Sequence, residues 1–182
     1  MKTMLRVMKK RKNSIPEEKW RIFEKIIENN EGENKFMEAI GEHFAEEQRF
    51  RLWEQYGSCR GTGYDKERKV FLLENVHLPL SERLEIYLCS IGKKFANKTL
   101  ATLLDEENNT ITVTFACDEC YKASQKGKIL APVKLHYESC AGGRLYYLEK
   151  ALGINLKIKT VDIPPNGVNA ENPCVFVFDI IE

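Results

Sequence analysis

Cysteine is the residue type whose spacing in this chain could support chemistry. Six cysteines occur in 182 residues, and the only close pair is Cys117 and Cys120, in the segment Cys117-Asp118-Glu119-Cys120. Two thiolates in a turn after a strand can bind one metal ion, and a divalent cation offsets the charge of the two intervening carboxylates. The same carboxylates disfavour a thioredoxin-like redox pair, because that chemistry needs a stabilised thiolate. Two thiols with no special role remain the third interpretation.

A metal site needs further ligands, and the sequence offers candidates downstream of this pair. His136 and Cys140 complete a C-x2-C-x15-H-x3-C arrangement, which lies within loose zinc-site spacings. Cys174 is an alternative to His136, because it begins the last predicted strand. We therefore predict a cysteine cluster that binds zinc through Cys117, Cys120, Cys140 and Cys174.

Cys140 has a second interpretation, as a catalytic nucleophile. The sequence predicts it at the start of a helix, where the helix dipole favours a thiolate. His136 lies four residues upstream and could act as its general base, which would make the chain a cysteine-dependent hydrolase or transferase. Packing of Cys140 beneath the Gly142-Gly143 backbone is the structural alternative.

A ligand pocket is predicted from Arg144, Tyr147 and Cys59. Arg144 is a candidate anion clamp on the predicted helix that carries Cys140, and Tyr147 follows it by three residues. Cys59 lies in the glycine-rich segment GSCRGTGY, which lacks the spacing of a phosphate loop and is expected to bring Cys59 near another element. An ordinary amphipathic helix face is the alternative role for Arg144 and Tyr147.

The elements that must position these side chains change type along the chain. Helical spacing of apolar residues predicts helices at about residues 15–29, 33–55, 65–75 and 81–92. Alternation then predicts strands or extended segments at about 99–104, 110–116 and 129–137, and from 154 onward. A helix at about 140–152, ended by Gly153, lies among them, and a last strand follows a loop at 164–173. Helices first and strands later indicate an α+β fold.

Composition and charge limit the class of protein. Apolar residues make up 43% of the chain and the formal charge is +1, which argues against a general nucleic-acid surface. No apolar run reaches the length of a membrane helix or a signal peptide, so we expect a cytoplasmic protein whose cysteines are thiols. Residues 1–12 carry six basic side chains and no acid, which predicts a solvated tail.

The carboxy-terminal part of the chain resembles known proteins. The stretch ESCAGGRLYYLEKALGINLKIKTVDIP, then NPCVFVFDII, with the pair FACDEC upstream, resembles a bacterial family of unknown function. More distantly it is similar to the 4-vinyl reductase-like domain, a small-molecule-sensing module with the ligand-binding fold of nitric-oxide sensors. The resemblance covers roughly residues 110–182 and implies a metal or reactive site at the four predicted cysteine ligands. A longer proline-asparagine loop before Cys174, and no glycine-aspartate there, distinguish this chain from the sensors.

These observations lead to one main hypothesis and two alternatives. We expect one α+β domain at 13–182, with a helical half (13–98) packed on a mostly antiparallel sheet half (99–182). Its expected function is binding or sensing of a small, partly apolar molecule in a pocket between helices and sheet. The alternatives are the cysteine-dependent enzyme and a protein-interaction module that uses the acidic helices of residues 13–47. The sequence assigns no oligomeric state.

Overall fold

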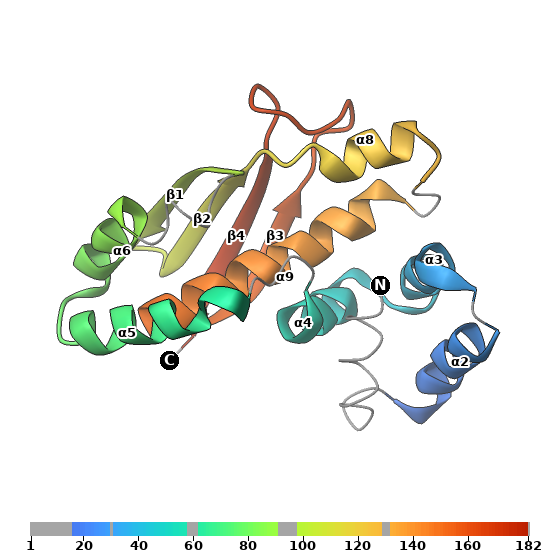
Figure 1. Ribbon diagram of the computed structural model, residues 1–182, viewed down its shortest axis with the longest axis horizontal. Coiled ribbons are helices and arrows are strands. Elements are labelled where there is room, and N and C mark those ends of the chain that lie inside the picture. Colours follow the sequence, from blue (N-terminus) through green and yellow to red (C-terminus); the bar gives the residue numbers. More distant parts are fainter. Residues whose placement is uncertain (1–15, 30, 58–61, 91–97, 129–131, 182) are drawn as a thin grey trace.

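The computed structural model describes residues 16–29, 31–57, 62–90, 98–128 and 132–181 (Figure 1). The predicted basic tail at 1–12 and Cys59 lie outside these residues. The described part is an α+β fold in which most helices precede an antiparallel sheet, as the sequence predicts. None of its helices has the length and apolar character needed to cross a membrane.

The amino-terminal half is helical. Its elements are α2 (Glu17–Glu28), α3 (Gly32–His43), α4 (Glu46–Tyr56), the short 3-10 helix η2 (Thr62–Tyr64), α5 (Asp65–Asn75) and α6 (Leu80–Cys89). The prediction of one helix over 33–55 is wrong, because the chain is extended at Phe44 and Ala45. Tertiary contacts hold this break: the Phe44 ring stacks on Phe23, and the Phe44 carbonyl accepts a hydrogen bond from Arg49.

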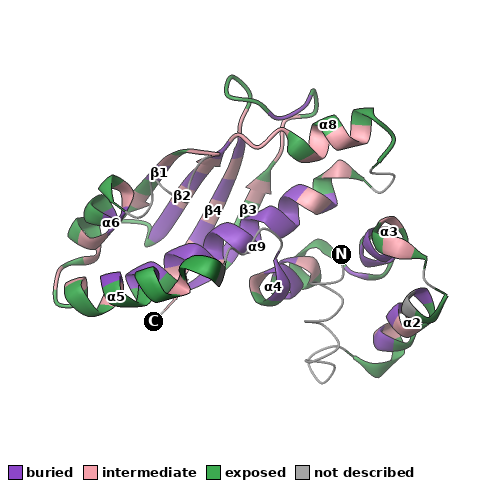
Figure 2. Cartoon of the chain, in the orientation of Figure 1, coloured by how far each residue is buried: buried purple, intermediate pink, exposed green. Residues whose placement is uncertain are grey.

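The carboxy-terminal half forms a four-stranded antiparallel sheet. Strands β1 (Thr99–Asp105), β2 (Thr110–Phe115), β3 (Asn155–Asp162) and β4 (Cys174–Ile181) occur in the order β1-β2-β4-β3. Alternate residues face the core, such as Ile111, Val113 and Phe115 of β2, whereas Thr112 and Thr114 are half-buried. The helices cover this inner face (Figure 2). The threonines therefore mark the opposite face.

Helix α9 (Val133–Leu152) is the centre of the fold and contacts α3, α4, α5, α6, α8, β3 and β4. Its amino-terminal part was predicted to be extended over 129–137 and is helical from Val133. Cys140 therefore lies in the interior of the helix, so the prediction that it begins a helix is wrong. Gly153 ends α9 in the left-handed conformation, with φ of 67°, as the sequence predicts. The short helix α8 (Glu119–Gln125) was not predicted.

Helices α4 and α9 are in direct backbone contact. A Cβ atom added to Gly142 would lie 2.0 Å from the Trp53 carbonyl oxygen, and one added to Gly57 would lie 2.4 Å from the Gly142 carbonyl carbon. Glycine is therefore required at both positions for the helices to pack this closely. One further contact across the interface is ionic, and it involves the buried Glu138.

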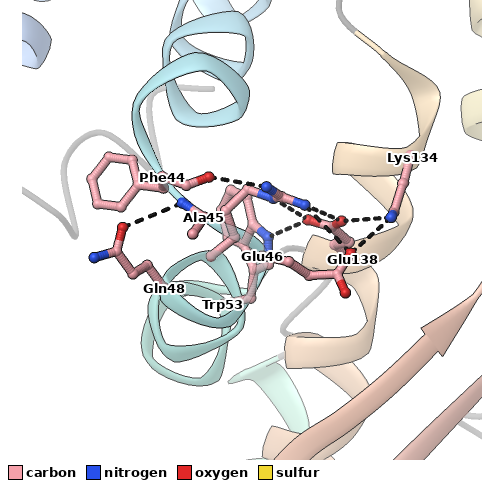
Figure 3. Close-up of polar contacts among 8 residues, drawn as sticks. Phe44, Ala45, Glu46, Gln48, Trp53, Lys134 and Glu138 are labelled. Atoms are coloured by element: carbon pink, nitrogen blue, oxygen red, sulfur yellow. Dashed lines mark hydrogen bonds and ion pairs between the residues drawn. The ribbon is translucent and has the colours of Figure 1, made fainter.

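Glu138 is fully buried on α9 and is bound from α4 by Arg49 (Figure 3). Arg49 donates from Nε and Nη2 to the two carboxylate oxygens at 2.8 and 2.9 Å, and Trp53 Nε1 donates to the same group at 3.4 Å. Lys134 lies 3.9 Å from Glu138 and 2.8 Å from Glu46. A bidentate arginine is a strong partner for a buried carboxylate, so this cluster joins α4 to α9 in one geometry.

Candidate functional site

Arg144 and Tyr147, two of the predicted pocket residues, line the same cavity. They lie three residues apart on α9, which places them on one face of the helix. The opposite walls come from Tyr87 of α6, Thr102 of β1 and Val113 of β2. The cavity therefore lies where the central helix, α6 and the first hairpin of the sheet meet, and we call it the Arg144 pocket.

The charge of Arg144 distinguishes this pocket. Arg144 is only 8% exposed, and its guanidinium lies over the rings of Tyr147 at 4.5 Å and Phe115 at 5.0 Å. No ion pair or hydrogen bond joins Arg144 to another described residue, and its Nε atom is buried without a hydrogen-bond partner. Aromatic faces attract a cation but accept no strong hydrogen bond, so the guanidinium keeps its capacity to donate.

The other buried charged residues of the described chain are compensated. Arg68 of α5 is fully buried, donates to Asp65 at 2.8 Å and lies 4.2 Å over the opposing Tyr147 ring. Glu138 has its bidentate partner in Arg49. Arg144 is the one residue of these three that has no charged partner among the described residues. Burying a charge without a partner is costly, so this residue needs an explanation.

Two tyrosines complete the polar lining of the Arg144 pocket. Tyr147 contacts both arginines through its ring. Burial raises the pKa of the Tyr87 hydroxyl, and the nearby positive charges of Arg68 and Arg144 partly oppose this increase. Tyr87 is therefore a neutral hydroxyl beside the two guanidinium groups, able to donate or accept a hydrogen bond.

The open space of the Arg144 pocket is small. Its volume is about 20 Å³, enough for roughly one water molecule. A charged group of a few atoms therefore enters only if the pocket walls move, and a larger body has to extend from the pocket. Larger hollows lie elsewhere, at about 190 Å³ between α2 and α4 and about 670 Å³ between α5 and α6.

Four of the cysteines lie within electrostatic range of Tyr137 or of Cys174, and we call them the thiol cluster; its one member on α9, Cys140, lies four residues before Arg144. Cys174 is fully buried at the start of β4, and Cys140 is 2% exposed, whereas Cys117 and Cys120 are half-buried. Burial raises the pKa of the Cys174 thiol to about 12, and the neighbouring Cys140, Asp162 and Cys117 add to this effect. Cys174 is therefore a protonated thiol at neutral pH.

Tyr137 of α9 holds the thiol cluster to the sheet. Its hydroxyl donates to the Cys117 carbonyl at 2.8 Å, which ties the chain leaving β2 to the central helix. Burial is the main cause that raises the pKa of Tyr137, and Cys120, Cys174 and Cys117 follow as electrostatic causes. Three thiols thus lie within electrostatic range of one phenol, and Cys140 is within range of Cys174.

The structure leaves the zinc hypothesis a prediction. Among the described residues, no group of three or more histidine, cysteine, aspartate or glutamate side chains is placed to hold a metal ion. The cysteine thiols predicted as ligands lie within electrostatic range of Tyr137 or of one another, but the described residues form no ligand set in this arrangement. Metal analysis of protein purified without added metal, compared with a Cys117→Ala variant, tests the hypothesis.

The geometry around Cys140 does not present a nucleophile paired with a base. His136 makes no hydrogen bond to Cys140, and its Nε2 atom is buried without a hydrogen-bond partner. Burial lowers the pKa of His136, and Glu33 of α3 partly opposes this change. The electrostatic neighbour that acts on His136 is therefore on α3. The enzymatic alternative remains a hypothesis, which selective alkylation of Cys140 near neutral pH would favour.

Sequence reasoning missed residues that come from distant elements. Arg68 and Tyr87 belong to α5 and α6, and no spacing rule relates them to Arg144 on α9. Tyr137 was overlooked because its segment was assigned an extended conformation. Three residues separate Tyr137 from Cys140, and helical spacing would have placed it beside the thiols.

The fold and these two groups of residues define an α+β domain with a buried arginine pocket beside a thiol cluster. Searches with protein-family models, curated proteins and solved structures find no match to this chain. The physical properties of the site therefore carry the functional argument.

Proposed function

We propose that this chain is a small-molecule-binding module, and that Arg144 binds a carboxylate group of its ligand. The observation that carries this proposal is a buried guanidinium that has no counter-charge among the described residues and lines a cavity. An anion in the Arg144 pocket would accept the hydrogen bonds that Arg144 has available and would offset its buried charge.

The dimensions of the pocket favour a carboxylate attached to a partly apolar body. Because the space of about 20 Å³ holds roughly one water molecule, the pocket walls have to move for a ligand group to enter, and a planar carboxylate needs less room than a tetrahedral phosphate. Val113 and the ring of Tyr147 supply apolar walls, and the hydroxyls of Tyr87 and Thr102 supply hydrogen-bonding groups. A few polar groups set among apolar walls are typical of small-molecule sites.

The resemblance to the 4-vinyl reductase-like domain supports the same class of function. A small-molecule-sensing module needs a ligand pocket, and the Arg144 pocket lies between α9, α6 and the sheet. Zinc in the thiol cluster remains a separate proposal, because ligand binding by Arg144 does not depend on it. In that proposal, the thiol cluster braces the middle of α9, one helical turn before Arg144.

Thermal unfolding with defined probes tests the proposal. We expect benzoate to raise the melting temperature of the protein, whereas neutral benzamide, which has nearly the same shape, leaves it unchanged. At a concentration of about ten times Kd, a ligand that binds only the folded state stabilises it by about 1.4 kcal/mol. For a chain of this length, that is an increase of about 3–6 °C. The melting temperature is also measured with phosphate and with chloride at the same ionic strength, to show whether other anions have the same effect.

Variants distinguish a binding role of Arg144 from a structural one. Arg144→Gln should abolish the benzoate effect without lowering the stability of the unliganded protein, because the uncompensated charge is removed. Arg21→Gln, at an exposed arginine paired with Glu17, is the matched control and should keep the full effect. A wild-type protein that responds to none of the anions, or an Arg144→Gln variant that keeps the response, would overturn the proposal.

A further inference from the structure

The Cys117–Cys120 segment is a tight turn that suits a disulfide bond. Asp118 has φ of −91° and ψ of 0°, and Glu119 begins helix α8, so both intervening residues are right-handed helical. Four residues in this conformation form a turn whose first and last Cα atoms are less than about 7 Å apart. A disulfide needs a Cα separation of about 4.4–6.8 Å. The backbone therefore needs no large rearrangement to join the two sulfurs.

Lysine side chains offset the charge of one of the two carboxylates in this turn. The carboxylate of Asp118 is 2.7 Å from Lys122 and 3.8 Å from Lys98, so two ammonium groups offset it. Cys117 also contributes to the raised pKa of Lys122, which places that ammonium within electrostatic range of the Cys117 sulfur.

Burial separates the four thiols into an accessible pair and an inaccessible pair. Cys117 and Cys120 are half-buried, whereas Cys140 and Cys174 are almost completely buried. Among these four thiols, those of the turn are therefore the ones that a dissolved oxidant reaches first. Cys89 of α6 is exposed as well, but it is far along the chain from the other cysteines of the described part and serves as an internal control.

We propose that Cys117 and Cys120 form a reversible dithiol–disulfide couple that is oxidised by hydroperoxides. The Cys117 thiolate attacks one oxygen of the peroxide, the O–O bond breaks, and the other oxygen leaves as alcohol or water after taking up a proton. Cys117 is then a sulfenic acid. The Cys120 sulfur attacks it, the S–S bond forms, and water leaves. The overall reaction converts two thiols and one hydroperoxide into one disulfide, one alcohol and one water.

Peptide mapping of the whole protein tests this proposal directly. The fully reduced protein is treated with one equivalent of hydrogen peroxide, and remaining thiols are blocked with N-ethylmaleimide. Trypsin cleaves after Lys98 and Lys122, so one peptide, 99–122, carries both cysteines of the turn. We expect this peptide to carry no N-ethylmaleimide. Its mass should be about 2 Da below that of the unmodified dithiol peptide, because disulfide formation removes two hydrogen atoms. Treatment with dithiothreitol should restore two blockable thiols.

Two variants and one control make the assignment specific. Cys120→Ser should stop the reaction at the sulfenic acid of Cys117, which dimedone traps, and Cys117→Ser should prevent oxidation of the peptide. Cys89→Ser should leave the 99–122 disulfide unchanged. Peroxide that oxidises Cys89 at least as fast as the turn, or a 99–122 peptide that keeps two free thiols, would overturn the proposal. The mapping uses the wild-type chain, so it stays decisive if a variant does not fold.

Discussion

The contact between α4 and α9 allows a quantitative test of the packing, through the substitution Gly142→Ala. The added Cβ would lie 2.0 Å from the Trp53 carbonyl oxygen and 3.0 Å from the Gly57 Cα. A carbon and an oxygen in contact are ordinarily about 3.3 Å apart, so the helices would have to separate by roughly 1.3 Å. The obstructing atoms belong to the backbone, and no side-chain rotation relieves the clash.

Two losses follow from this separation. A gap of about 0.5–1 Å already removes a quarter to a half of each dispersion contact across an interface. The Arg49–Glu138 hydrogen bonds, at 2.8 and 2.9 Å, would also lengthen to about 4 Å and no longer be hydrogen bonds. The better helix propensity of alanine returns only about 1 kcal/mol. We expect the free energy of unfolding to fall by at least about 3 kcal/mol, at the upper end of overpacking effects.

Urea unfolding followed by circular dichroism measures this change, and Gly41→Ala is the matched control. Gly41 is also inside a helix, but its added Cβ would meet only the flexible Cδ1 of Leu135, at 3.0 Å. We expect that variant to remain within about 1 kcal/mol of the wild type. A Gly142→Ala protein as stable as the Gly41→Ala protein would refute the close approach of the two helices.

Two further predictions concern the end of α9 and the buried histidine. Gly153→Ala should lower the free energy of unfolding by about 1–2 kcal/mol in urea unfolding, because φ of 67° disfavours a side chain; an unchanged value would contradict this conformation. The pKa of His136 is lowered from its ordinary value of 6.5, so the unfolded chain binds a proton that the folded chain does not. Stability should therefore fall as pH falls below about 6.5, until the folded pKa is reached. The variant His136→Gln should lack this part of the loss, and identical pH profiles for the two proteins would show that the imidazole is not buried.

The fold class was predictable, but two element boundaries depend on tertiary structure. Alternation of Val133, Leu135 and Tyr137 with Lys134 and His136 is typical of a strand, yet the segment begins α9. A central helix is buried on nearly all sides, so its apolar residues lose the one-sided spacing by which surface helices are predicted. The break at 44–45 carries no proline or glycine, and it is identified by contacts of Phe44 with Phe23 and Arg49 and by the hydrogen bond from the Ala45 N–H to Gln48.

The part of the candidate site that lies on one helix was predictable, whereas the contacts between different elements were not. Arg144 and Tyr147 are three residues apart, so helix geometry alone places them on one face. The contact of Arg68 with Tyr147 has no such rule, because Arg68 comes from another helix, α5. The charges around Cys117 show the same limit: Asp118, Glu119 and Lys122 are neighbours in the sequence, while Lys98, the second cation near Asp118, comes from before β1.

The glycine contact between α4 and α9 also determines which side of the Arg144 pocket can yield to an incoming molecule. Because the backbone of α9 packs directly on the backbone of α4, α9 cannot move toward α4. The wall of the pocket that carries the guanidinium is therefore rigid. The opposite wall consists of α6 and β1. In the described sheet, β1 is an edge strand that pairs with β2 on one side only. Co-crystal structures should accordingly differ from the unliganded protein on the α6 and β1 side, with α9 as the common frame for superposition.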